Sequence, residues 1–141
     1  VFLEPFNPVA VAVSMNASFV ARAFSGDVEK TKEIIKHAIM HKGYSLVDIL
    51  HPCVSFNKAN NFSWYRNNTY YLDDNHDPSD KGAALERSLE TDKLPLGVIY
   101  INSGNKTFEE NLSAYKNSVI PLYVRKLDAE KLMRVIEARR Y

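Results

Sequence analysis

Cysteine is almost absent from this sequence: Cys53 is the only one in 141 residues. A single cysteine excludes an internal disulfide framework. The chain also lacks a long apolar run, so no segment reaches the roughly 20 residues that a membrane span needs, and no signal peptide is recognisable at its start. It lacks an excess of either charge, because its formal net charge is +1. This balance suggests neither a nucleic-acid nor a membrane partner.

What remains is the composition of a globular protein, with 45% hydrophobic and 25% charged residues. The length is that of one domain with a sizeable core. We expect a cytoplasmic protein, and we interpret the Asn-x-Ser/Thr sequons as chance matches in a chain rich in asparagine. These sequons lie at Asn16, Asn61, Asn67, Asn105 and Asn111.

The segment from Leu46 to Leu50 predicts a buried strand of a covered parallel sheet. Its apolar residues form a nearly continuous run that only Asp48 interrupts. Because Pro52 cannot donate to a strand ladder, the strand is expected to end before it and to leave Cys53 at its carboxyl tip. Ligands bind at this edge of open α/β sheets, so Cys53 is the strongest candidate for a functional residue.

The preceding residues predict a strand and a helix that lead into this segment. Residues 18–24 alternate and favour a strand with one apolar face, and Arg22 within it is interpreted as an ion-pairing or surface residue rather than an anion contact. Asp27 is a good helix N-cap, residues 28–42 form an apolar stripe, and Gly43 is expected to end the helix. Strand, helix and strand together predict a βαβ unit.

Three histidines are weaker candidates. His37 and His41 are four residues apart on the predicted helix, so they could share a metal, but no third ligand has a matching spacing and we interpret them as exposed. His76 has the side chain of a catalytic base, but nothing in the sequence supplies its partner.

The other predicted elements follow from caps and hydrophobic periodicity. Asn7 and Pro8 predict the start of a short helix, whereas Asp77 and Pro78 predict the cap and first position of a later one. The predicted elements are helix 9–15, a helical turn at 62–66, strand 70–72, a helix ending near residue 90 with Ala83, Ala84, Leu85 and Leu89 buried, strand 95–101, a helical turn at 107–110, and a terminal helix that Asp128 caps.

Several ordered blocks of this sequence together resemble the β subunit of 2-oxoacid:ferredoxin oxidoreductases, the family of pyruvate and 2-oxoglutarate enzymes. The resemblance implies an α/β fold with a layered, mostly parallel sheet and flanking helices, within a thiamine-diphosphate-binding-type domain. Residues 1–103 would form its C-terminal part, and residues 104–141 a C-terminal extension with a terminal helix. The blocks are EPFNP at 4–8, FVARAFSGD at 19–27, HPCVSFN at 51–57, WY at 64–65, HDPSD at 76–80 and LGVIY at 96–100.

The resemblance also implies an activity: the coenzyme-A-dependent oxidative decarboxylation of a 2-oxoacid, with electrons passing to ferredoxin. The implied cofactors are thiamine diphosphate, Mg²⁺ and a [4Fe–4S] cluster, of which Cys53 would be the fourth ligand. The implied partners are an α subunit, further subunits, ferredoxin, the 2-oxoacid and coenzyme A, in an oligomer.

Two parts of the family pattern have no counterpart in these residues. The diphosphate motif and the three other cluster cysteines lie upstream of the EPFNP block in the family. We therefore expect this chain to be the C-terminal half of a subunit, or a product that lacks the first half. Alone, it is expected to bind no cofactor and to be inactive.

The residues themselves leave a second hypothesis open. The chain could be a non-catalytic α/β module that assembles with partner subunits, with Cys53 as a buried structural thiol. A half-domain is also expected to expose a sheet edge and an apolar face, and to self-associate through them.

Overall fold

The computed structural model describes residues 5–126 and 128–140. Glu4, the first residue of the EPFNP block, lies outside this range. The chain divides into two compact units, Val1–Thr107 and Phe108–Tyr141. The family-based division between residues 103 and 104 stays a prediction.

The first unit contains a four-stranded sheet with the strand order β2-β1-β4-β3. The β1–β2 and β3–β4 pairs are parallel, and the central β1–β4 pair is antiparallel. Helices flank this mixed sheet, so the predicted α/β class is confirmed. The elements are α1 (Pro8–Ser14), β1 (Phe19–Phe24), α2 (Val28–Met40), β2 (Ser45–Leu50), α3 (Phe62–Asn67), β3 (Thr69–Tyr71), α4 (Lys81–Ser88) and β4 (Leu94–Ile101).

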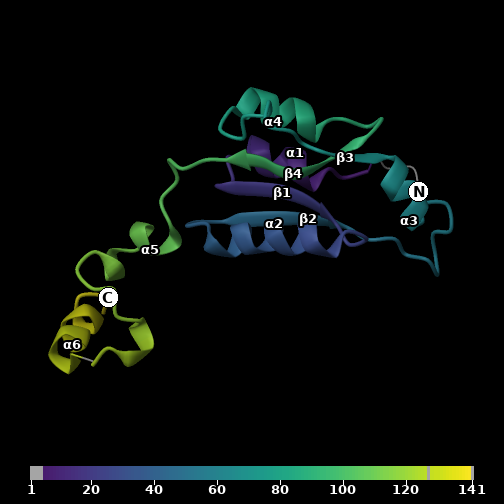
Figure 1. The fold of residues 1–141 in the computed structure, drawn as a ribbon. Coiled ribbons are helices and arrows are strands. Elements are labelled where there is room, and N and C mark those ends of the chain that lie inside the picture. Colours follow the sequence, from purple (N-terminus) through teal and green to yellow (C-terminus); the bar gives the residue numbers. More distant parts are fainter. Residues whose placement is uncertain (1–4, 127, 141) are drawn as a thin grey trace. The chain divides into compact units, whose positions relative to one another are not determined.

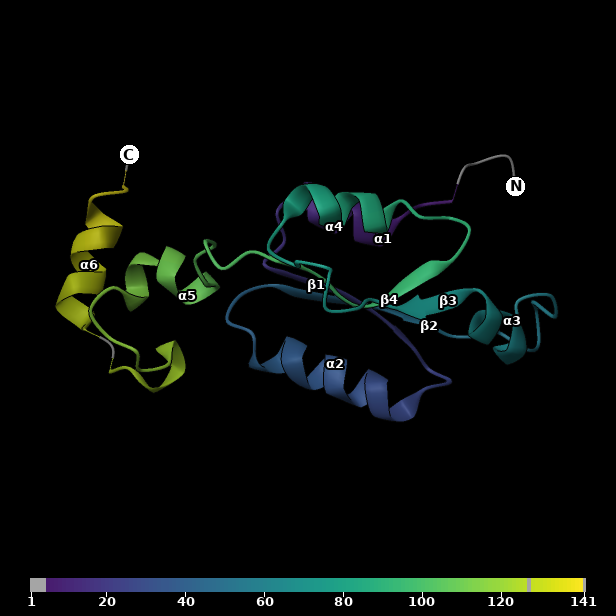
Figure 2. The same cartoon turned by 45° about the horizontal axis from the view of Figure 1, so that its top comes forward.

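Helices cover both faces of the sheet. α1 and α4 lie together over one face and α2 lies on the other (Figures 1 and 2). One core cluster joins Val9 and Val13 of α1 to Val20 and Ile99, and a second joins Ile34 of α2 to residues of β1. All six residues of β1 are therefore buried, which corrects the prediction of a strand with one apolar face.

The predicted helix caps are observed at α1 and α2. The Asn7 side chain accepts a hydrogen bond from the backbone N–H of Ala10 at 3.0 Å, and Asp27 accepts one from Lys30 at 3.2 Å. However, α2 ends at Met40, earlier than predicted, and its C-cap is extended. Gly43 has a φ of 131° and turns the chain into β2, so its conformational freedom serves the connection and not the helix end.

β2 departs from the prediction of a fully buried strand. It is the outer strand of the sheet next to β1, five of its six residues are half-buried, and Ile49 is 41% exposed. Within the described residues no strand pairs with its other side. The apolar run of β2 is typical of a strand inside a covered sheet. In the described residues, however, β2 is the last strand on its side of the sheet. The expected exposed sheet edge is thus observed.

The start of α4 was also predicted wrongly. Asp80 is its N-cap and accepts hydrogen bonds from the backbone N–H groups of Gly82 and Ala83. Asp77 instead accepts hydrogen bonds from the Ser79 hydroxyl and backbone N–H, at 2.7 and 2.8 Å, and these hold the pKa of Asp77 below its ordinary value. Of the four residues predicted to be buried, Ala84 is buried, Ala83 and Leu85 are half-buried, and Leu89, which follows the end of α4, is 58% exposed.

The second unit is built of short helical segments. They are α5 (Phe108–Asn111), 3-10 turns at Ser113–Tyr115 and Leu122–Val124, and α6 (Ala129–Glu137). Asp128 caps α6 as predicted, by accepting from the backbone N–H of Lys131 at 3.0 Å. The apolar side chains of α6 are partly exposed. Among the described helices of the whole chain, none is long and apolar enough to cross a membrane.

One ion pair crosses the parallel β1–β2 ladder. Arg22 and Asp48 are register neighbours, and Nε of Arg22 lies 2.8 Å from Oδ2 of Asp48. The arginine side chain is 6% exposed and the aspartate 23%. Nη1 of Arg22 is buried and finds no hydrogen-bond partner in the described parts of the chain. The ion-pairing interpretation of Arg22 is confirmed.

We expect Asp48→Ala to lower the free energy of unfolding by about 3–5 kcal/mol, because it leaves a buried guanidinium without a counter-charge. Urea unfolding followed by circular dichroism measures this loss. Glu29→Ala is the matched control: it removes the carboxylate of the exposed Glu29–Lys32 pair and should cost less than about 1 kcal/mol. Equal effects of the two substitutions would contradict a structural role for the buried pair.

Candidate functional site

The candidate site lies where the parallel strands β1 and β2 end together. Phe24 and Leu50 are the last register partners, and the backbone N–H of Ser25 donates to the carbonyl of Leu50 at 3.0 Å. Beyond β1 the chain turns into α2, and beyond β2 it enters the segment that carries Cys53. The carboxyl ends of parallel strands form the edge at which α/β sheets bind ligands.

A closed turn presents Cys53. Pro52 is fully buried, whereas Cys53 is exposed. The backbone N–H of Asn57 donates to the carbonyl of Cys53 at 2.8 Å, and the Asn57 side chain accepts from the backbone N–H groups of Ala59 and Asn60. The structure therefore places the thiol at the strand tip, as predicted. Its exposure contradicts the hypothesis of a buried structural thiol.

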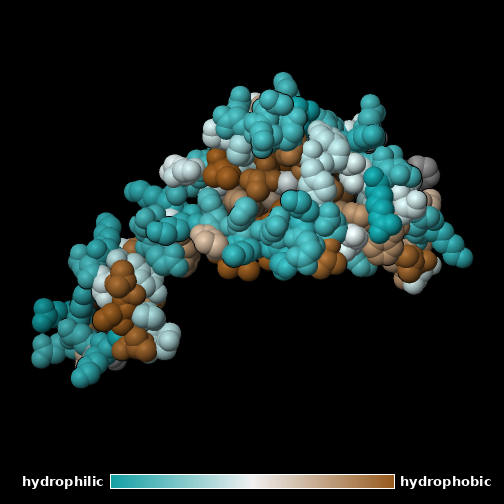
Figure 3. Space-filling model, viewed as in Figure 1, coloured by the Kyte–Doolittle hydropathy of each residue, from teal (hydrophilic) through white to brown (hydrophobic). Residues whose placement is uncertain are grey.

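The residues inside this turn expose both backbone donors and apolar side chains. The backbone N–H groups of Val54, Ser55 and Phe56 make no hydrogen bond within the described residues. Val54 is 61% exposed and Phe56 is 95% exposed. Residues coloured as hydrophobic reach the surface where the β2–α3 segment lies (Figure 3). The turn thus offers a thiol, backbone donors and apolar surface at one place.

Aromatic side chains pack together at the end of β1, on the same edge of the sheet. The ring of Phe24 lies 5.6 Å from that of Tyr65 and 6.1 Å from that of Phe62, both on α3. A Cβ atom on Gly26 would clash with the Phe24 ring, so this glycine is required by close approach. α3 is capped by Asn61, which accepts from the backbone N–H of Trp64 at 2.9 Å. The segment that follows Cys53 is thereby attached to the end of β1.

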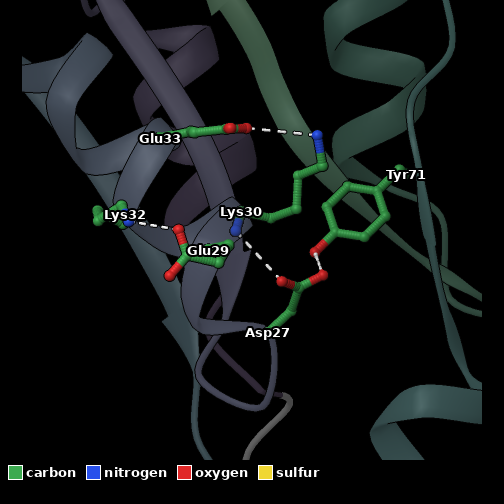
Figure 4. Close-up of polar contacts among 6 residues, drawn as sticks. All are labelled: Asp27, Glu29, Lys30, Lys32, Glu33 and Tyr71. Carbon is green, nitrogen blue, oxygen red and sulfur yellow. Dashed lines mark hydrogen bonds and ion pairs between the residues drawn. The ribbon is translucent and has the colours of Figure 1, made fainter.

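A cavity of about 440 Å³ lies beside the first turn of α2. Its lining includes Phe24, Asp27, Arg66 and Tyr71. The Tyr71 hydroxyl donates to Oδ2 of Asp27 at 2.8 Å, while Oδ1 of Asp27 caps α2 at Lys30 (Figure 4). Both carboxylate oxygens of Asp27 are therefore used in holding the fold.

The environment of Tyr71 keeps its phenol protonated. Partial burial, the hydrogen bond to Asp27 and the charge of that carboxylate raise the pKa of Tyr71 well above its ordinary value. Tyr71 therefore serves as a hydrogen-bond donor near neutral pH and not as a base. The hydrogen bond from Tyr71 to Asp27 joins β3 to the start of α2, although the two residues are 44 positions apart in the sequence.

The histidines belong to no metal-binding cluster among the described residues. Nε2 of His76 lies 2.9 Å from the carbonyl oxygen of Ile99, which makes it a structural donor. His37 is exposed, as predicted, whereas His41 is half-buried, with its ring 5.4 Å from that of Phe19, which corrects the prediction that both are exposed. Across residues 5–126 and 128–140, no three His, Cys, Asp or Glu side chains are placed to hold a metal ion.

Cys53 is thus the one predicted site residue that the structure presents at the sheet edge. Sequence reasoning missed the exposure of Phe56 and the bond between Tyr71 and Asp27, because neither hydrophobic periodicity nor spacing reports on contacts between distant segments. A signal for Phe56 was available, since an aromatic side chain inside a short turn has little chance of burial there.

Comparisons with known proteins agree on one family. The family described as the C-terminal part of the pyruvate ferredoxin oxidoreductase β chain matches residues 53–117. A β subunit of a Sulfolobus 2-oxoacid:ferredoxin oxidoreductase is 38% identical over 142 residues, which cover 92% of this chain and 45% of that protein. The β subunit of the Aeropyrum pernix 2-oxoacid:ferredoxin oxidoreductase 1 is 39% identical over 122 residues, which cover 78% of this chain and 38% of that protein.

A solved structure has the same fold. It is a 2-oxoglutarate:ferredoxin oxidoreductase from Magnetococcus marinus with 2-oxoglutarate, coenzyme A and succinyl-CoA bound. It superimposes with a TM-score of 0.80 at 30% identity, over 95% of this chain and 45% of that one. This chain therefore spans less than half the length of the relatives that it matches.

We expect the free energy of unfolding to fall as the pH rises above 10, and Tyr71→Phe to remove part of this fall. Because the pKa of Tyr71 is raised in the folded state from an ordinary value of 10.0, the unfolded chain loses this proton first. The stability that Tyr71 contributes is complete below pH 10 and declines as the pH rises toward the folded-state pKa. Urea unfolding at a series of alkaline pH values measures the slope.

Tyr123→Phe is the matched control, because Tyr123 is 88% exposed and its removal should leave the slope unchanged. Near neutral pH, Tyr71→Phe should cost about 1 kcal/mol for the lost hydrogen bond. Equal slopes for the wild type and Tyr71→Phe would contradict the raised pKa.

Proposed function

This chain is related to the C-terminal region of 2-oxoacid:ferredoxin oxidoreductase β subunits, and we propose that it works as part of such a subunit. The complete enzyme would oxidise and decarboxylate a 2-oxoacid with coenzyme A and pass the electrons to ferredoxin. An α subunit is the proposed partner.

The exposed thiol of Cys53 at the carboxyl tip of β2 carries this proposal. We assign it to one iron of a [4Fe–4S] cluster, whose other three ligands would come from polypeptide outside these 141 residues. The fit is supported by the closed turn that holds the thiol outside the core, and by the N–H groups of Val54, Ser55 and Phe56, which are free within the described residues. Cluster sulfurs accept hydrogen bonds from such backbone groups. When bound, the cluster supplies one-electron transfer.

The residues of this chain do not fit thiamine diphosphate and Mg²⁺. The sequence has no Gly-Asp-Gly motif, and the Asp27 carboxylate beside the 440 Å³ cavity is occupied by Tyr71 and by the α2 cap. We therefore assign these cofactors, the 2-oxoacid and coenzyme A to the rest of the enzyme. This chain alone should not turn over.

In this proposal, the role of this chain is to position Cys53 as a ligand of the cluster. The Arg22–Asp48 pair joins β1 to β2 two residues before β2 ends. Buried Pro52 then fixes the direction in which the chain leaves the sheet, and the Asn57–Cys53 hydrogen bond fixes the turn. Such an ordered ligand keeps the cluster in one geometry as its charge changes.

The assembly-module hypothesis has one supporting observation, the open edge of β2 in the described sheet. This hypothesis also requires Cys53 to be a buried structural thiol, and the exposure of Cys53 contradicts that requirement. An open sheet edge also suits a chain whose sheet is continued by other polypeptide, so this observation does not favour a non-catalytic module over the oxidoreductase.

In the complete enzyme, we expect Cys53→Ala to abolish the electron paramagnetic resonance signal of this cluster and to lower the bound iron and sulfide accordingly. The substitution removes one of four thiolate ligands, while the exposed position of Cys53 leaves the core intact. Ser55→Ala, in the same turn, is the control and should retain the cluster. A Cys53→Ala enzyme with full iron content and an unchanged signal would refute the assignment.

A further inference from the structure

We propose that the open edge of β2 pairs with a parallel strand that another part of the complete subunit supplies. That strand would come from polypeptide outside these 141 residues. The inference rests on the proposed function in one respect, because that function places the chain within a longer subunit. It makes no use of the assignment of Cys53, so the two can fail separately.

β2 has backbone groups that point away from its described neighbour. At the end of the β1–β2 ladder, the N–H of Ser25 donates to the carbonyl of Leu50 at 3.0 Å. Since the residues that bond to one neighbour alternate along a strand, the even-numbered residues of β2 face β1. The N–H and C=O groups of Val47 and Ile49 therefore face the other side, where no described strand pairs with them.

This edge lacks the usual features that keep an exposed strand from pairing. β2 contains no proline and no lysine, and its register with β1 is regular over six residues. Its only charged residue, Asp48, is paired with Arg22. Ile49 is 41% exposed. A regular edge without an unpaired charge is typical of a strand that is covered in the working assembly.

The apolar pattern of β2 favours a parallel neighbour over a second copy of this chain. Leu46 packs against the core cluster that contains Val9 and Val13 of α1, whereas Val47 packs against the cluster that contains Ile34 of α2. A strand with apolar residues on both faces is typical of the inside of a parallel sheet. Two copies joined at β2 by twofold symmetry would instead pair these strands antiparallel.

A buried donor beside β2 supports the same conclusion. The Arg22 side chain is 6% exposed, and its Nε is bonded to Asp48 of β2. Its Nη1, however, has no hydrogen-bond partner within the described residues. Because buried donors in native proteins nearly always have an acceptor, we assign this acceptor to the polypeptide that covers the edge.

The test is residue-resolved amide hydrogen exchange on the complete enzyme, which needs no substitution in β2. The amides of Val47 and Ile49 should exchange as slowly as those of Leu46 and Asp48, because all four would be hydrogen-bonded. β1, which is paired on both sides, gives the reference for a fully bonded strand. If Val47 and Ile49 exchange about tenfold faster than their two neighbours, the edge is open and the proposal is overturned.

A substitution at the edge provides a second measurement. Ile49→Lys should lower the yield of assembled, soluble enzyme severalfold, because its charge would lie beside the added strand. Ile49→Val keeps an apolar, β-branched side chain and should match the wild type. An open edge would tolerate the lysine, so equal yields for Ile49→Lys and the wild type would count against the pairing.

The outcomes also identify the partner and separate this inference from the proposed function. Protection of Val47 and Ile49 that is lost on dilution, as copies dissociate, would indicate a second copy and overturn the proposal. Fast exchange at these amides, together with a cluster lost in Cys53→Ala, overturns the strand pairing alone. Slow exchange with a cluster that survives Cys53→Ala supports the pairing and overturns the ligand assignment alone.

Discussion

Arg22 and Asp48 face each other across two parallel strands, and the site depends on the pairing that they hold. Their 2.8 Å contact joins register partners of β1 and β2. Because the strands are parallel and in fixed register, the turn after β1 and the turn after β2 emerge at one edge. A change of register would shift the end of β2, and with it the segment that carries Cys53, relative to the end of β1. Because the Arg22 guanidinium is buried and Asp48 is its counter-charge, loss of Asp48 would leave an uncompensated charge between the two strands.

Local signals explain most of what the sequence predicts correctly. Caps at Asn7, Asp27 and Asp128, and a proline after β2, are short-range features with one dominant outcome. Asp77 and Asp80 were both possible N-caps of α4, and the sequence pattern alone could not decide between them. The choice depends on which backbone N–H groups each side chain reaches. The edge position of β2 and the exposure of Cys53 depend on which strands pair with which, and no residue spacing encodes that.

The proposed function divides the chemistry between this chain and the rest of the enzyme. The first unit has a core on both faces of its sheet and an ordered turn that carries the thiol. The proposed cofactor and substrate chemistry belongs to the rest of the enzyme, consistent with a chain that spans less than half of its relatives. In the described second unit, α6 has partly exposed apolar residues, namely Leu132, Met133, Val135 and Ile136. The most specific chemical contribution that we propose for this chain is therefore one cluster ligand, Cys53, and its surroundings.

The most direct test of this account is a crystal structure of the complete complex, with iron located by its anomalous scattering. We predict an iron site within bonding distance of Sγ of Cys53, on the turn closed by Asn57. Iron sites coordinated only by other cysteines, with the Cys53 thiol free and the turn packed elsewhere, would contradict the central claim.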